Sequence, residues 1–294
     1  MAKRGRTGFI IAFLSPAVLL YGFFVVWPLL QAFYYSLFRW KGLSPNKTFI
    51  GLENFQNLVK DEAFHKAVWN NLAILVVGGF AILVLGVLLA HGLQSNSRPI
   101  RALRGLYLFP QVVSLVVVAI IWQFMYDPSS GLLTKGAGAV GLDGFTKPLA
   151  DSSQALGAVG IAFVWYSLGF YVMLFSAGLK QIPEEVNEAA ELDGSRGWHR
   201  FWAVTWPMLW PVKRIATIYI VINVLNIFAL VWVMTGGGPN RATETLLTLL
   251  YKTAFKDSLY GYGTSVAVAN FIIAMAFAVV LMFLFRKNPE ERRA

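Results

Sequence analysis

The chain has 294 residues, of which 57% are apolar, 15% are aromatic and only 14% are charged. This composition excludes an ordinary soluble fold, whose surface would carry more charge. The absence of cysteine excludes disulfide bonds, thiolate metal sites, iron–sulfur clusters and thiol nucleophiles. The net charge of +10 does not point to nucleic acid, because the basic residues flank apolar stretches, as is typical of membrane topology.

Six windows of 22 to 32 residues contain no Lys, Arg, Asp or Glu, and they lie at 7–38, 67–97, 105–126, 152–179, 215–240 and 258–285. About 20 apolar residues in a helix span a hydrocarbon core of about 30 Å, so each window fits one helix and is too short for two. The sequence therefore predicts an all-α polytopic membrane protein, a single transmembrane domain over residues 1–294. Its six transmembrane helices are expected at about 9–37, 68–91, 105–126, 154–179, 213–234 and 264–286. Prolines 16, 28 and 110 predict kinks in the first and third of these.

The distribution of basic residues predicts the orientation. One face of the membrane receives the N-terminal tail, the 91–104 loop, the 180–214 loop and the C-terminal tail, which together carry 15 Lys and Arg. The other face carries 10 on longer connections. By the positive-inside rule the first face is cytoplasmic, which places both termini on the cytoplasmic side of the cell inner membrane.

Residues for chemistry are sparse in this sequence. The three histidines, His65, His91 and His199, lie in different regions and form neither a metal pair nor a visible triad. No phosphate-binding loop of the G-x-x-x-x-G-K-[ST] type occurs, and apart from His91 at a cytoplasmic edge the windows hold no ionisable group for ion coupling. We expect no catalytic residue, metal or cofactor in this chain, so ATP-driven transport would need another polypeptide to bind ATP and Mg.

The loop at 180–214 has the pattern of a folded helical hairpin. Pro183 followed by two glutamates predicts a helix start, and Ile182, Val186, Ala189 and Ala190 form a narrow apolar stripe at helical spacing. Asp193-Gly194 predicts the helix end, because glycine readily adopts the left-handed conformation. A second stripe follows at Trp198, Phe201 and Trp202, before Pro207 and Pro211.

Two interpretations of this hairpin are open from the residues alone. It can lie on the bilayer surface, with its aromatic side chains in the interface opposite Arg196, His199 and Arg200. Alternatively, it can insert into a groove of a cytoplasmic partner, since the alanines permit close approach.

Two ordered motifs resemble a known family. The string IPEEVNEAAELDGSRGWHRFWAVTWPMLWP resembles the EAA loop of binding-protein-dependent ABC importer permeases. The block Thr235-Gly236-Gly237-Gly238-Pro239 resembles a segment of the maltose-type carbohydrate permeases within that family. The sequence departs from the family pattern at Trp206, where leucine is usual, and at Ala229, where many relatives carry a polar or acidic residue.

The resemblance implies one of two permease subunits that pair in the membrane, a heterodimer being expected. A cytoplasmic ATPase would dock on the EAA loop at 180–211, and an extracytoplasmic solute-binding protein would deliver the substrate. By this resemblance Glu188 is the charged contact, Ala189 and Ala190 are the close-packing surface, and Gly194 is the pivot. The coupling residues it implies are Glu188, Ala189, Ala190, Asp193, Gly194, Trp198, Phe201 and Pro207.

A carbohydrate is the substrate that the resemblance favours, either a monosaccharide or an oligosaccharide. A pathway without charge fits a neutral solute, whose hydroxyl groups Asn223 and Asn226 can bind and whose ring face Tyr219, Trp165 and Tyr166 can stack on. A glycerol-phosphate permease is an alternative of the same architecture. A secondary carrier or channel that acts alone is an alternative of a different class.

The predicted topology can be tested with cysteines introduced into this cysteine-free chain. We expect cysteines at Ser44, Ser130 and Ser258 to react with an impermeant maleimide added to intact cells, because these positions are predicted to face outside. A cysteine at Ser195 should react only after the membrane is permeabilised. Reaction of Ser195→Cys in intact cells would contradict the predicted orientation.

Overall fold

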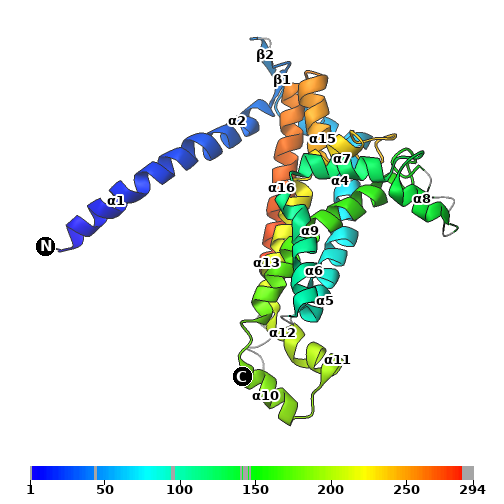
Figure 1. Ribbon diagram of the computed structural model, residues 1–294. Helices are drawn as coiled ribbons and strands as arrows, with labels where there is room; N and C mark the ends of the chain where they lie inside the picture. The colour runs from blue at the N-terminus through cyan, green and yellow to red at the C-terminus, as the bar shows by residue number, and fades with distance from the viewer. Residues whose placement is uncertain are drawn as a thin grey trace. The chain divides into compact units, whose positions relative to one another are not determined.

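The computed structural model describes residues 2–42, 45–93, 97–139, 141, 145 and 147–286. Ser44 and the basic residues of the C-terminal tail beyond Arg286 lie outside the described residues. The contacts divide the chain into two compact units, one of residues 1–61 with 249–271 and one of residues 62–248 with 272–294. Each unit is described by itself below, and Figure 1 gives the element labels.

The described residues are mainly helical and contain four continuous helices long and apolar enough to cross a membrane, Phe9–Tyr35, Glu62–Gly92, Ala155–Leu179 and Tyr260–Leu284. Two further pairs of helices reach the same hydropathy but are sharply bent, by 112° at residues 113–114 and by 70° at residue 209. The structure therefore supports four to six candidate spans. The predicted number of six is reached only if each bent pair crosses the membrane once.

The first unit holds a long apolar helix and a small cap. Its elements are α1 (Ala2–Tyr21), η1 (Gly22–Val26), α2 (Trp27–Tyr35), β1 (Phe38–Trp40), β2 (Lys47–Phe49), α3 (Glu53–Lys60), η4 (Lys252–Lys256), the end of α15 (Leu246–Tyr251) and the first half of α16 (Tyr260–Leu284). No side chain between Phe9 and Tyr35 is buried, which suits a helix surrounded by lipid. The first predicted span is one continuous helix from Phe9 to Tyr35, and its π-helical turn η1 lies between Pro16 and Pro28.

The cap, which consists of β1, β2, α3 and the start of α16, is stabilised by hydrogen bonds to backbone carbonyls. Strands β1 and β2 pair antiparallel with Phe38 opposite Phe49. The buried Asn54 on α3 donates to the carbonyls of Ser36 and Phe38. The start of α16 lies so close to β1 that a Cβ on Gly261 would be 1.9 Å from the Phe38 carbonyl oxygen.

The second unit is a helical bundle around α9. Its elements are α4 (Glu62–Ala73), η2 (Ile74–Gly78), α5 (Gly79–Gly92), α6 (Arg98–Val112), α7 (Leu115–Met125), α8 (Leu132–Ala139), α9 (Ala155–Leu179), α10 (Glu184–Leu192), α11 (Gly197–Arg200), η3 (Phe201–Thr205), α12 (Trp206–Met208), α13 (Trp210–Leu225) and α14 (Ala229–Met234). Helix α9 packs against α5, α6 and α13, with Val159, Val172 and Phe175 fully buried (Figure 1). It is apolar on every side, and half of its apolar window is buried, which suits a helix that contacts other helices on one side and lipid on the other.

Two of the predicted spans are not single straight helices. The span predicted at 105–126 is broken by the extended residues Val113 and Ser114, three residues beyond Pro110. The span predicted at 213–234 is interrupted, because α13 ends at Leu225 and α14 begins only at Ala229. The prediction of a continuous helix over 213–234 was therefore wrong, and the reason is that tertiary hydrogen bonds stabilise the break.

A glycine allows the close contact between α6 and α9. A Cβ on Gly169 would lie 2.3 Å from the backbone carbonyl oxygen of Tyr107, which cannot move aside cheaply, whereas a Cβ on Gly160 of the same helix would meet nothing within 4 Å. We expect Gly169→Ala to destabilise the protein by about 1–3 kcal/mol through overpacking. Gly160→Ala should be neutral or slightly stabilising, since alanine favours a helix.

The measurement is the thermal unfolding midpoint of each variant in detergent. A Gly169→Ala protein as stable as Gly160→Ala would contradict the assigned contact between α6 and α9.

Candidate functional site

The hairpin predicted from the sequence is present as a helix, a turn and a second helical segment (Figure 1). Pro183 is the N-cap of α10, and Glu184 and Glu185 occupy its first turn, where acids favour the positive end of the helix dipole. Helix α10 ends at Leu192, and Gly194 has a φ of 73°.

Two backbone hydrogen bonds close this helix end. The N–H of Ser195 donates to the carbonyl of Ala190 at 2.8 Å, and the N–H of Gly194 donates to that of Glu191 at 3.1 Å. This pair of bonds is the Schellman motif, which requires a left-handed residue at the position of Gly194. The turn that aims the second segment therefore depends on one glycine.

The second segment, from Gly197 to Met208, carries a cluster of aromatic side chains. Phe201 stacks on Trp198 with ring centroids 5.1 Å apart, and its other neighbours are Trp202 and Trp206. Phe201 also lies 5.0 Å from the ring of His91 at the end of α5. It is only 1% exposed, so it attaches the hairpin to the bundle and does not belong to the surface that a partner would meet.

The hairpin leaves a different set of residues exposed. Glu188, Ala189, Asp193 and Gly194 are exposed, and Ala190 is buried. Leu192 is 90% exposed, Trp198 59% and Trp202 49%. Pro207 is half-buried. Among the predicted coupling residues, Ala190 and Phe201 are thus buried, and most of the others are exposed.

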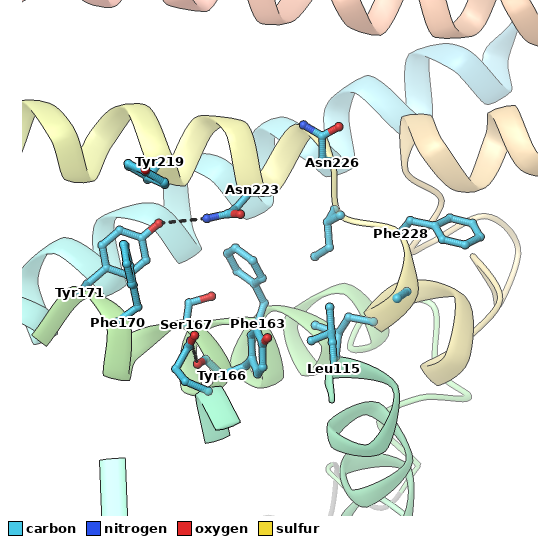
Figure 2. Close-up of a pocket in the computed structure, with 14 residues that line it drawn as sticks. Leu115, Phe163, Tyr166, Ser167, Phe170, Tyr171, Tyr219, Asn223, Asn226 and Phe228 are labelled. Atoms are coloured by element: carbon cyan, nitrogen blue, oxygen red, sulfur yellow. Dashed lines mark hydrogen bonds between the residues drawn. The ribbon is translucent and has the colours of Figure 1, made fainter. Parts of the chain in front are cut away.

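A cavity of about 480 Å³ lies between α9 and α13, at the points where α6 meets α7 and α13 meets α14 (Figure 2). It brings together four of the five predicted pathway residues, Tyr166, Tyr219, Asn223 and Asn226. Its complete lining is Gln111, Leu115, Phe163, Tyr166, Ser167, Phe170, Tyr171, Tyr219, Asn223, Asn226, Ile227, Phe228, Ala229 and Leu230. None of these side chains is charged.

The polar groups of the cavity are positioned by hydrogen bonds. The amide nitrogen Nδ2 of Asn223 donates to the hydroxyl of Tyr171 at 3.4 Å, as Figure 2 shows. Asn226 Nδ2 donates to the Ile222 carbonyl at 2.8 Å, and Gln111 Nε2 donates to the Tyr166 carbonyl at 2.5 Å. These bonds leave amide oxygens, beside aromatic rings, to accept hydrogen bonds from a ligand.

Three polar residues of the cavity were not found from the sequence. Gln111, Ser167 and Tyr171 line it, and the last two are 6% and 1% exposed. Ser167 and Tyr171 are spaced four residues apart on α9, which puts them on one face. The four-residue spacing is visible in the sequence, but α9 is apolar on every side, so the two residues do not form a distinct polar stripe.

Trp165, the fifth predicted pathway residue, lies elsewhere. It lines a separate apolar groove formed by η2, α5 and α9, and its ring is 5.6 Å from that of Trp122. Trp165 therefore does not line the cavity with Tyr166, because adjacent helical residues point about 100° apart and do not face the same way.

The glycine-rich motif forms the turn after α14. Thr235 is the C-cap of that helix, and Gly236 and Gly237 have φ of 58° and 87°. The hydroxyl groups of Thr235 and Thr243 are 2.6 Å apart, and that of Thr243 donates to the Gly238 carbonyl at 2.8 Å. The motif, which ends at Pro239, therefore forms a turn after α14, and none of its residues lines the cavity.

Two aspartates outside the candidate spans accept hydrogen bonds in local turns. Asp127 accepts hydrogen bonds from the side chains and backbone N–H groups of Ser129 and Ser130, and these bonds hold its pKa well below the usual range. Asp151 is bonded in the same way by Ser153, which also lowers its pKa. Over the part of the chain that the structure describes, no three His, Asp or Glu side chains gather as a metal site would require.

Comparison with known proteins identifies the family. Residues 82–288 match the family described as binding-protein-dependent transport system inner membrane component, so the chain belongs to that family. The match includes the hairpin, the cavity and the glycine-rich motif, but it begins after the first long apolar helix.

Full-length relatives are also similar. The chain is 35% identical to the probable ABC transporter permease protein YurN of Bacillus subtilis over 95% of this chain and 96% of that protein. It is 34% identical to the diacetylchitobiose uptake system permease protein NgcF of Streptomyces coelicolor, over 96% and 83% of the two chains.

The fold matches a solved transporter structure. A chain of a bacterial ABC transporter involved in the import of the acidic polysaccharide alginate superposes with a TM-score of 0.82 over 96% of both chains, at 19% identity. The two chains therefore share a fold over nearly their whole length.

Proposed function

We propose that this chain is the multi-pass permease subunit of an ATP-driven importer and that it translocates a neutral carbohydrate received from an extracytoplasmic solute-binding protein. The observation that carries the proposal is the uncharged cavity, in which aromatic rings alternate with amide and hydroxyl groups. Aromatic faces stack on sugar rings, and amides bind sugar hydroxyl groups. Family membership and the relative that serves in diacetylchitobiose uptake support the same assignment.

The charge of the substrate follows from the cavity lining. An acidic sugar or a glycerol phosphate would need a cationic or strongly donating partner, because leaving a charge unpaired in a desolvated site is costly. The 14 lining residues include no Lys, Arg or His. The cavity therefore favours a neutral solute over glycerol phosphate.

The partners and the topology complete the proposal. Both termini and the hairpin at 180–211 lie on the cytoplasmic side of the inner membrane. The six spans form one transmembrane domain, since α15 and α16 each contribute residues to both compact units. A second permease subunit pairs with the chain in the membrane. A cytoplasmic ATPase, which carries ATP and Mg, docks on the exposed hairpin residues around Glu188, and the chain itself is not an enzyme.

Reconstitution tests the proposal directly. Liposomes that contain the chain, its partner permease and its ATPase should take up a neutral sugar when ATP and the loaded binding protein are present. Alginate oligosaccharides and glycerol phosphate should not enter. Tyr166→Ala, in the cavity, should lower uptake on the order of tenfold, as expected for the loss of a stacking residue. Trp165→Ala, its neighbour outside the cavity, should not.

Two outcomes would contradict the proposal. Uptake of glycerol phosphate in place of sugar would make the glycerol-phosphate permease the correct interpretation. Proton-driven uptake by the purified chain without any ATPase would establish a secondary carrier.

The coupling role of the hairpin is tested at Gly194. A Cβ at this position would meet nothing within 4 Å, so a substitution acts only through the positive φ. Gly194→Val should strain the turn by about 1–3 kcal/mol and misaim the second segment, whereas Gly194→Asn, which tolerates this conformation, should be close to wild type.

We expect Gly194→Val to reach the membrane in normal amounts but to lose uptake, with weak ATPase co-purification or futile ATP hydrolysis. Glu188→Ala should show a milder loss. If Gly194→Val kept full uptake and ATPase binding, the hairpin would be better explained as an interfacial surface structure.

A further inference from the structure

The break between α13 and α14 is held by side chains from two other segments. Asn71, on α4, donates from Nδ2 to the Val224 carbonyl at 2.7 Å and accepts from the Leu246 N–H at 2.9 Å. Thr245, adjacent to Leu246, donates from its hydroxyl to the Ile227 carbonyl at 3.1 Å. Asn71 is 2% exposed and Thr245 is fully buried, so these bonds are protected from water.

These bonds take the place of backbone bonds that a continuous helix would make. In an uninterrupted helix the Val224 carbonyl would accept from the N–H of residue 228, and the Ile227 carbonyl from that of residue 231. The structure instead gives Val224 the Asn71 amide and the N–H of Ile227. A side-chain donor at each carbonyl therefore favours the broken helix over the continuous one.

The break determines which side chains line this end of the cavity. Asn226 is the C-cap of α13, and the chain leaves the helix between Asn226 and Phe228, both of which line the cavity (Figure 2). If α13 continued as a helix, Phe228 would point elsewhere, because each helical residue rotates by about 100°. The shape of the cavity at this end thus depends on atoms that do not touch it.

We infer that Asn71 and Thr245 are positioning residues for the transported solute. They form a polar clamp that holds the break open and sets the place of Asn226 and Phe228. The clamp is reinforced by Asn70, which donates to the carbonyls of Arg241 and Glu244 and so fixes the loop that carries Thr245. This role in transport rests on the proposed function, whereas the effect on the backbone does not.

The test uses isosteric variants and a matched control. Thr245→Val removes the hydroxyl and keeps the shape, and Thr245→Ser keeps the hydroxyl. Thr134→Val is the control, because Thr134 is also buried and also donates to a backbone carbonyl, that of Asp127, but it lies on α8, which contributes no residue to the cavity. Asn71→Leu removes the other half of the clamp.

The direct measurement is the spectrum of a spin label on Phe228→Cys, which would be the only cysteine in the chain. Thr245→Val and Asn71→Leu should change the mobility of the label, and Thr245→Ser and Thr134→Val should not. If Asn71→Leu does not fold, the comparison of Thr245→Val with Thr134→Val carries the test alone. Spectra that Thr245→Val and Thr134→Val alter equally, or not at all, would overturn the clamp.

Transport supplies a second measurement, made without the label in the reconstituted complex. Thr245→Val should lower sugar uptake per ATP hydrolysed on the order of tenfold, as expected when a buried hydrogen bond is lost. The Thr134→Val complex should keep the wild-type ratio. An unchanged ratio in Thr245→Val would overturn the role in transport. Absence of sugar uptake in the wild type would instead contradict the proposed function, while the label would still report on the clamp.

Discussion

Every backbone N–H and C=O group at membrane depth has to find a partner inside the protein, because the hydrocarbon core offers none. The described residues meet this constraint mostly with continuous helices, and the interruptions of these helices include Val113–Ser114 and residues 226–228. Both breaks border the same cavity, which is lined by Gln111 and Leu115 on one side and by Asn226 to Leu230 on the other. Irregular backbone is tolerated where it lines a cavity. The cavity therefore obtains its polarity from amides and hydroxyls next to broken helices and not from charged side chains.

Helix α9 links this cavity to the rest of the bundle. Small residues let its neighbours approach closely. Gly169 leaves room for the Tyr107 carbonyl of α6, and Gly178 leaves room for Val212 of α13. On the α5 side the fit comes from the partner helix, where Gly86 faces Phe175. Because the contacts are tight, a displacement of one of these helices cannot be absorbed by loose packing and has to move its neighbours.

Local signals allowed the sequence to predict what is local in this fold. Charge-free windows located α9, α16 and the two other continuous spans, and Pro183 and Gly194 located both ends of α10. The break at 226–228 was missed because the residues around it, apart from Asn223 and Asn226, are apolar and include neither proline nor glycine. Its cause lies at Asn71 and Thr245, which are distant in sequence. The inward direction of Phe201 was missed for a similar reason, since its partner His91 is more than 100 positions away.

The order of the elements supplies a physical route for coupling under the proposed function. The hairpin connects the end of α9, at Leu179, with the start of α13, at Trp210, and these two helices form the opposite walls of the cavity. Phe201 ties the same hairpin to α5 through His91, and Gly178 and Val212 hold α9 against α13 directly beside it. A tilt of the hairpin by a partner would therefore act on both walls at once, through short and buried contacts.

In α13 the displacement would travel as far as Asn223 and Asn226, because the helix is continuous only up to the break. The polar clamp lies at that point. It therefore separates the part of the wall that can follow the hairpin from the glycine-rich turn, which is stabilised by the hydrogen bond from Thr243 to the Gly238 carbonyl.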